Sequence, residues 1–258
     1  MPDKRLRKTT EEYVEQASKF EEHGQMTKAI GEMMKAVRAA SDKGPVYRNL
    51  ANLYREKRQI NEAITSIKKA IKAKPGDTQA REMLLEMLLE VCKYDEAIRE
   101  AKDLLDFSPR NLGARDVLSI AYLQMGMLEQ AIQVTNELIV LDPTSPANHF
   151  KKAVLFQQKG EIGTAIHEFT RVLEMQPDLD MAEQAQQAID TLDSYQLRHI
   201  VMLAVEDYLF RTKLIHDPEA AALERGYYMS YSGMAALKQI QFDDLTDVYS
   251  EWKQKYYH

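Results

Sequence analysis

The chain has 258 residues, of which 45% are hydrophobic and 29% charged, a balance typical of a folded globular protein. Its formal net charge of −6 argues against a general nucleic-acid-binding protein, which would carry an excess of Lys and Arg for the phosphates. Cys92 is the sole cysteine and no apolar run approaches the roughly 18 residues of a membrane span, so we expect a cytoplasmic protein without an intrachain disulfide or a membrane-inserted segment.

A motif of 34 residues recurs along the first part of the chain. An Ala-Ile pair stands at residues 29–30, 63–64, 97–98, 131–132 and 165–166, and a proline stands at residues 75, 109, 143 and 177. A fixed period of this size is typical of stacked helix-turn-helix repeats rather than of one closed core. The spacing predicts five repeats, at residues 10–43, 44–77, 78–111, 112–145 and 146–179.

Each repeat is expected to form two amphipathic helices. In the second repeat Tyr47, Leu50 and Tyr54 fall on one helical face, and Ala63 and Ile67 do so in its second half. The recurring alanine lets the paired helices approach closely. The recurring proline ends the second helix because it cannot donate a backbone hydrogen bond.

The turn between the two helices favours a residue that tolerates a positive φ angle. Gly24, Gly126 and Gly160 hold this position in three repeats, and Arg58 and Cys92 replace glycine in the other two. Glycine adopts the left-handed conformation without the steric cost of a Cβ atom, so it ends the first helix readily. These positions therefore mark the break inside each repeat.

The second repeat resembles the tetratricopeptide repeat family. The family pattern of aromatic, Leu, small residue, Tyr, Ala, Phe, Ala and Pro falls here on Tyr47, Leu50, Ala51, Tyr54, Ala63, Ile67, Ala70 and Pro75. The resemblance implies an all-α fold, a right-handed superhelix of antiparallel helix pairs whose first helices line a concave groove. Two local departures are Ser41, in place of the proline, and Lys152, where Leu is usual.

In this family the groove side chains come from the second, fifth, ninth, twelfth and thirteenth places of each repeat. Those places change chemistry from repeat to repeat here, so packing between repeats does not dictate them. The resemblance implies a polar, partly basic section at Arg48, Asn52 and Arg55 and an acidic section at Glu82, Glu86, Glu90 and Asp116. It further implies an apolar section at Ile120, Leu123, Phe150 and Val154, with Gln157 at the twelfth place of the fifth repeat.

Such a surface suits a peptide or helix of a partner protein that carries basic and apolar residues. Two alternatives remain open: the acidic residues could form a solvated face, and the apolar ones could be covered by another part of this chain. The carboxylate clamp of the chaperone-binding family members is absent, because Met83, Gly113 and Val117 replace its later residues.

The repeat register fails after residue 179. An apolar stripe with Met181, Ala185 and Ile189 predicts a helix at 180–194 that caps the solenoid, which would span residues 10–194. A separate C-terminal helical domain is expected at 195–258. Its first segment, residues 195–216, is predicted to be one long helix, followed by helices that start at Asp217-Pro218 and at Ser230 or Ser232, with Gly226 between them.

Residues 206–240 resemble the small helical domain in leader regions of some ribosomally made, enzymatically modified peptides, and the small helical subunit of certain extradiol aromatic-ring dioxygenases. The shared pattern falls on Asp207, Phe210, Arg211, Leu214, Asp217, Pro218, Ala222, Leu223 and Gly226. The resemblance implies a surface presented to a partner protein. No precursor core or leader-cleavage motif follows it, and the alternative is a structural helical cap with ordinary start and stop signals.

No motif indicates catalysis, a cofactor or a metal. The sequence has no Gly-rich phosphate loop, no GxSxG and no HExxH. The six histidines lack paired ligand spacing, Cys92 has no second cysteine beside it, and His149 and His167 are expected to be structural. We therefore expect a protein that is not an enzyme and binds no cofactor.

The main hypothesis is a cytoplasmic adaptor or assembly scaffold that binds a partner segment in the groove. The alternative is an accessory recognition protein of a peptide-modification or oxygenase-type enzyme assembly, which acts through the leader-like segment. A third possibility is that the tail with Trp252, Lys253, Lys255 and Tyr256 folds into the groove and blocks it. The sequence leaves the oligomeric state open, so self-association is compatible with each of the three.

Overall fold

The computed structural model describes residues 8–244, and every regular element in that range is a helix, which confirms the predicted all-α fold. The tail around Trp252, which the third possibility places in the groove, lies outside this range. The chain divides into two compact units, Met1–Val134 and Thr135–His258. The border between these N-terminal and C-terminal units falls within α8 (Leu128–Leu141).

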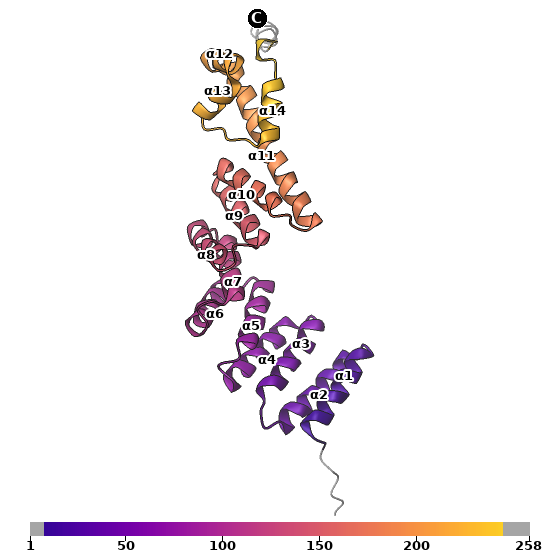
Figure 1. Ribbon diagram of the computed structural model, residues 1–258. Coiled ribbons are helices and arrows are strands. Elements are labelled where there is room, and N and C mark those ends of the chain that lie inside the picture. Colours follow the sequence, from indigo (N-terminus) through magenta and orange to yellow (C-terminus); the bar gives the residue numbers. More distant parts are fainter. Residues whose placement is uncertain (1–7, 245–258) are drawn as a thin grey trace, which may run out of the picture. The chain divides into compact units, whose positions relative to one another are not determined.

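The N-terminal unit holds the first three repeats and the first helix of the fourth. Its helices are α1 (Thr10–Glu22), α2 (Met26–Ala39), α3 (Gly44–Glu56), α4 (Ile60–Ala73), α5 (Thr78–Glu90), α6 (Tyr94–Phe107) and α7 (Leu112–Gln124). Each helix packs against the next one along the chain, and α5 also packs against α7, the first helix of the following repeat (Figure 1). The repeats in this unit begin with the odd-numbered helices, and α5 and α7 are two such first helices that pack against each other.

The C-terminal unit holds the fifth repeat and the helices that follow it. Its elements are α9 (Pro146–Lys159), α10 (Ile162–Glu174), α11 (Leu179–Glu206), α12 (Tyr208–His216), α13 (Pro218–Glu224), α14 (Tyr231–Gln239) and the short 3-10 helix η1 (Phe242–Asp244). Helix α10 packs against α9 and α11, and α11 also packs against α12 and α14. No helix within residues 8–244 is both long and apolar enough to cross a membrane.

The recurring alanines are fully buried, as a close approach of paired helices requires. Ala29, Ala63, Ala97, Ala131 and Ala165 are all 0% exposed, and the isoleucines beside them are buried or half-buried. A side chain larger than a methyl group at these places would push its surroundings apart, because protein interiors are close-packed. The 34-residue spacing thus places one small, fully enclosed residue in every repeat.

The turns inside the repeats share one backbone conformation. Gly24, Gly126 and Gly160 have φ angles of 68°, 71° and 81°, and the residues that replace glycine, Arg58 and Cys92, have φ angles of 61° and 55°. A left-handed conformation costs a residue with a Cβ atom about 1–2 kcal/mol. Since Arg58 and Cys92 adopt it nevertheless, the packing of the flanking helices determines the turn.

The helix break predicted near Tyr195 is wrong. Helix α11 runs for 28 residues, from Leu179 to Glu206, and passes through the predicted border between residues 194 and 195. The sequence of α11 contains neither Gly nor Pro, so nothing interrupts its backbone hydrogen bonds. That residues 195–258 form a domain of their own stays a prediction.

The prediction of a single helix at residues 195–216 is also wrong, because one helix ends and the next begins at Asp207. The Asp207 carboxylate accepts a hydrogen bond from the Phe210 backbone N–H at 2.9 Å, which caps α12, and Arg225 donates to its other oxygen at 2.5 Å. A side chain that binds the backbone in this way competes with helix continuation. The break therefore needs no Gly or Pro.

Two polar side chains of α11 hold the segment between α13 and α14. Gln196 donates to the Tyr228 carbonyl at 2.7 Å and accepts from the Tyr228 N–H at 2.9 Å. Asp193 accepts from the N–H of Ser230, the cap of α14, at 3.0 Å and from the Ser230 hydroxyl. Asp193 and Gln196 are 4% and 2% exposed, so these bonds are shielded from water.

Most residues of the leader-like pattern have structural roles in this fold. Phe210 and Leu214 lie in the core of the C-terminal helices, and the buried Arg211 donates to the Ala204 carbonyl at 3.0 Å. Asp217 caps α13, and Gly226 has a φ angle of 79°. Caps, core residues and a terminal glycine suit the structural-cap alternative as well as they suit a recognition domain.

Candidate peptide-binding surface

The predicted groove residues lie on the first helices of the second to fifth repeats. Nine of them, from Arg48 to Leu123, belong to α3, α5 and α7 in the N-terminal unit. The other three, Phe150, Val154 and Gln157, belong to α9 in the C-terminal unit. Of these residues, the structure brings Arg55 into contact with Glu86 and Glu90. We call the surface of α3, α5 and α7 that carries the nine residues the first-helix face.

The fifth place of the second repeat bridges to the next repeat. Arg48 Nη1 donates to both carboxylate oxygens of Asp77, at 3.1 and 2.9 Å. Asp77 is the N-cap of α5, where the same carboxylate accepts from the Ala80 N–H at 3.0 Å. Arg48 therefore fixes the start of the next first helix, a role that the groove prediction did not include.

The fifth place of the third repeat repeats this arrangement. Asn111, the N-cap of α7, donates from Nδ2 to Glu82 Oε1 at 2.6 Å and accepts from the Ala114 N–H at 2.7 Å. The sequence separation is 29 residues, as in the pair of Arg48 with Asp77. The signal that could have revealed both bridges is the cap-forming residue two places after Pro75 and Pro109.

One residue of the basic section, Arg55, pairs with two residues of the acidic section across α3 and α5. Arg55 Nη1 lies 2.9 Å from Glu86 Oε2, and Arg55 Nη2 also hydrogen-bonds Glu90. Partial burial opposes the charge on Arg55, but the bonds to Glu90 and Glu86 outweigh it and raise the pKa of the guanidinium. The acidic section is thus neither a fully solvated face nor a set of unpaired charges.

The apolar residues of the surface are half-buried. Phe150 and Val154 pack against the core of α9, α10 and α11, and the Phe150 ring meets the Phe169 ring edge-on at a centroid distance of 5.3 Å. Ile120 and Leu123 are also half-buried, as is Asp116, whereas Asn52 and Gln157 are exposed. Phe150 and Val154 are therefore apolar at least partly because they pack against this core.

A polar cluster joins α9 and α10, the two helices of the fifth repeat. His149 Nδ1 lies 2.8 Å from Glu168 Oε2, and Lys152 Nζ lies 2.9 Å from Glu168 Oε1. Burial opposes the charge of Glu168, but its bonds with His149 and Lys152 outweigh burial and hold the carboxyl pKa below its usual value. The cluster explains why Lys152 replaces the usual Leu.

His149 and Glu168 of this cluster are shielded from solutes. His149 is 1% exposed, and its Nε2 atom has no hydrogen-bond partner among residues 8–244. A general acid or base must come within hydrogen-bond reach of a substrate, which the burial of His149 prevents in this conformation. Among residues 8–244, no three His, Cys, Asp or Glu side chains are grouped so that they could hold a metal ion.

Comparisons with known proteins agree with the helical repeats. The model of the tetratricopeptide repeat family matches residues 45–77, which is the second repeat. No curated protein matches the chain. Among solved structures, the segment of MamA from residue 41 to its end, from Desulfovibrio magneticus RS-1, has a TM-score of 0.59 and 20% identity, over 66% of this chain and 97% of that one.

Two further structures show the same similarity. YrrB, a tetratricopeptide repeat protein with an unusual peptide-binding site, has a TM-score of 0.56 and 20% identity, over 68% of this chain and 90% of its own. A thermophilic tetratricopeptide repeat protein of Thermus thermophilus has a TM-score of 0.51 and 17% identity, over 70% of this chain and 98% of its own. The chain therefore has the fold of tetratricopeptide repeat proteins over about two-thirds of its length.

The substitution Glu168→Gln should destabilise the C-terminal unit by roughly 2–3 kcal/mol at neutral pH, because it leaves Lys152 without its carboxylate. The lowered pKa means that the carboxylate contributes stability above its unfolded value near 4.5, and that this contribution is lost as the pH falls through the lower folded value. Urea unfolding followed by circular dichroism should show a difference between wild type and variant that shrinks in acid.

Glu174→Gln, at the exposed end of the same helix, is the matched control and should change stability by less than about 0.5 kcal/mol. A wild-type stability equal to that of Glu168→Gln at neutral pH would contradict the role of the cluster. So would a difference that stays constant into acid.

Proposed function

We propose that the protein is a non-enzymatic adaptor or assembly scaffold of the cytoplasm, which binds a peptide or helix of a partner protein on the first-helix face. The supporting observation is the set of exposed, exchangeable ion pairs between α3 and α5. The Arg55 side chain is 35% exposed, and its partners Glu86 and Glu90 are 55% and 37% exposed. Exposed pairs of this kind are worth about 0–1 kcal/mol, so a basic partner residue can displace Arg55 at low cost.

The neighbouring side chains favour a partner with both basic and apolar residues. Asn52 is exposed next to Arg55 on α3 and can hydrogen-bond a peptide backbone. Ile120 and Leu123 on α7 leave part of their surface open and supply apolar contact within the same unit. A charged patch beside an apolar one is the arrangement that fixes the register of a bound helix or peptide.

The double substitution Glu86→Gln/Glu90→Gln tests this proposal. Peptides selected from a random display library on the immobilised full-length protein should be rich in Lys or Arg and in apolar residues. The dissociation constants of the synthetic peptides, measured by fluorescence anisotropy, should rise about tenfold for the variant, because both carboxylates that receive the basic residues are gone.

The double substitution Asp103→Asn/Asp106→Asn is the matched control. It makes the same change in net charge at exposed positions on α6, and peptide affinity should stay within about twofold of wild type. Unchanged affinity for Glu86→Gln/Glu90→Gln, or an equal loss in the control, would place the binding site elsewhere.

A second candidate function is favoured by the C-terminal helices. Eight of the fourteen exposed large hydrophobic residues among residues 8–244 gather here: Tyr195, Met202, Tyr208, Leu209, Ile215, Leu223, Tyr228 and Tyr231. Leu223, Tyr228 and Tyr231 also line a recess of about 380 Å³. Exposed apolar clusters commonly mark sites of protein contact, so these helices suit an accessory recognition protein of a peptide-modification or oxygenase-type enzyme assembly.

The substitutions Leu223→Ser/Tyr231→Ser test this second candidate. Affinity purification with the full-length protein should retain an enzyme of one of the two types, and the variant should lose it, because apolar contact area is removed from the recess. Val140→Ser/Leu179→Ser, at two other exposed apolar positions of the chain, should leave retention unchanged. Retention of the same enzyme by Leu223→Ser/Tyr231→Ser would rule the candidate out.

A further inference from the structure

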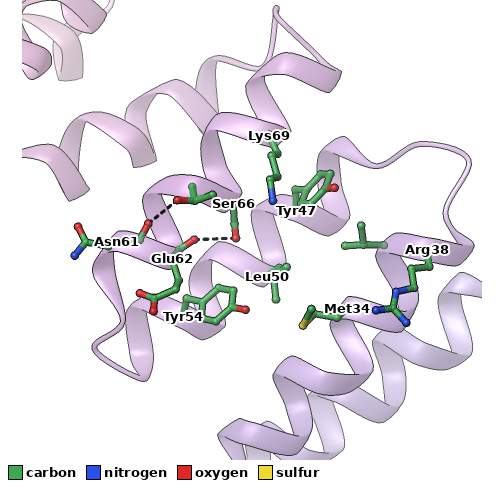
Figure 2. A pocket seen from close by; sticks show the side chains of 11 residues that line it. Met34, Arg38, Tyr47, Leu50, Tyr54, Asn61, Glu62, Ser66 and Lys69 are labelled. Atoms are coloured by element: carbon green, nitrogen blue, oxygen red, sulfur yellow. Dashed lines mark hydrogen bonds between the residues drawn. The ribbon is translucent and has the colours of Figure 1, made fainter.

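An apolar hollow of about 440 Å³ lies between α2, α3 and α4 in the N-terminal unit (Figure 2). The hollow is lined on the α3 side by Tyr47, Leu50 and Tyr54. Met34 of α2 also lines it and is 43% exposed. We call this site the hollow. Its volume is within the range of natural ligand pockets, about 300–1,000 Å³.

The hollow lies on a different face of α3 from the predicted groove residues. Successive helix residues are rotated by about 100°, so Tyr47, Leu50 and Tyr54 share one face and Arg48, Asn52 and Arg55 share another. A ligand of the hollow would therefore contact the second helices α2 and α4, not the first-helix face. The site goes beyond the proposed function of that face.

The hydroxyl groups along α4 leave the interior of the hollow largely apolar. Thr65 Oγ1 donates to the Asn61 carbonyl, and Ser66 Oγ donates to the Glu62 carbonyl, each at 2.9 Å (Figure 2). Both hydroxyl hydrogens are therefore directed to the backbone of their own helix. An apolar or aromatic side chain would meet mainly carbon surface, and burying it there is favourable by roughly 25 cal/mol per Å².

Charged side chains surround the apolar interior of the hollow. Neither Arg38 nor Lys69 forms an ion pair within residues 8–244, and the Lys69 ammonium lies 5.8 Å from the centre of the Tyr47 ring. Glu62 lies beside Tyr54 at the other end (Figure 2). Two cations without carboxylate partners at the border of an apolar site attract an anionic group that is attached to an apolar one.

The surrounding sequence strengthens this positive field. Residues 26–77 contain twelve Lys and Arg but only five Asp and Glu, which gives a net charge of +7 in a chain whose total is −6. The rest of the chain therefore carries −13. A concentrated positive segment in an acidic protein steers anionic partners to that segment.

In the next repeat, ion pairs occupy the positions that correspond to the hollow. A shift of 34 residues places Lys68, Glu96, Arg81 and Glu100 where the hollow has Met34, Glu62, Tyr47 and Ser66. Lys68 forms an ion pair with Glu96, and Arg81 Nη1 lies 3.9 Å from Glu100 Oε2, so two ion pairs cross that groove. The first groove has a carboxylate in Glu62 but no lysine opposite it.

We propose that the hollow binds an acidic segment of a partner protein. An aromatic or large aliphatic side chain of the segment contacts Tyr47, Leu50 and Tyr54, and flanking carboxylates lie near Arg38 and Lys69. The replacement of the bridging lysine by Met34 keeps the groove open for this side chain.

The substitution Met34→Lys is the sharpest test, because it restores the lysine that pairs with Glu62 in the manner of Lys68 with Glu96. It closes the hollow while it adds a positive charge. The probe is a fluorescein-labelled peptide with one tryptophan flanked on both sides by glutamates, and binding to the full-length protein is measured by fluorescence anisotropy. We expect the affinity for this peptide to fall about tenfold or more, because the hollow is closed. If the peptide were attracted by net charge alone, the added lysine would raise its affinity instead.

The double substitution Arg38→Glu/Lys69→Glu should weaken binding to a similar extent. Its matched control is Lys43→Glu/Lys72→Glu, which makes the same charge change at exposed positions of the basic segment that do not line the hollow. The control should cost less than about threefold in affinity. The double substitution Glu86→Gln/Glu90→Gln should not weaken binding of this peptide, so failure here and failure of the first-helix face are distinguishable.

Three results would overturn the proposal. The first is Met34→Lys binding the peptide as tightly as wild type or more tightly. The second is equal affinity for a peptide with alanine in place of the tryptophan, which would show that the apolar contact is irrelevant. The third is competition by a single-stranded oligonucleotide at the same concentration as the peptide, which would make the segment a general surface for polyanions.

Discussion

Close contact between the paired helices of each repeat is the constraint on which the rest of the structure depends. A fully buried alanine at the same place in all five repeats permits this contact, and it recurs with a period of 34 residues. Because the contact fixes the inner faces, the outward positions are free to change chemistry from one repeat to the next. The exposed charges and apolar side chains that suit partner binding all occupy such positions.

Polar bridges between neighbouring repeats take up part of that freedom. Arg48 and Glu82 occupy places expected to contact a ligand, yet each binds the cap of the next first helix. The same logic applies on the second helices, where Lys68 and Glu96 join two repeats. Positions that carry such a bridge stabilise the stack, and positions where it is missing, such as Met34, leave surface available for a partner.

The sequence predicts the repeats well because their period depends on small, local requirements. The buried alanines and the left-handed turns at Gly24, Gly126 and Gly160 follow from steric rules that act within a few residues. The break at Asp207 was missed, since a capping aspartate is a common residue and is distinctive only when its hydrogen bond is seen. The pairing of Arg55 with Glu86 and Glu90 was also missed, because it joins residues 31 and 35 positions apart whose side-chain directions the sequence does not specify.

The packing of the recurring alanines is the basis of the whole stack, and the free energy of unfolding of Ala97→Leu tests this most directly. Ala97 on α6 is 0% exposed, so the added carbons should cost about 1–3 kcal/mol or more in urea unfolding. Ala73→Leu, at the exposed end of α4, should be nearly neutral. Equal stability of Ala97→Leu and wild type would contradict this role of the alanines.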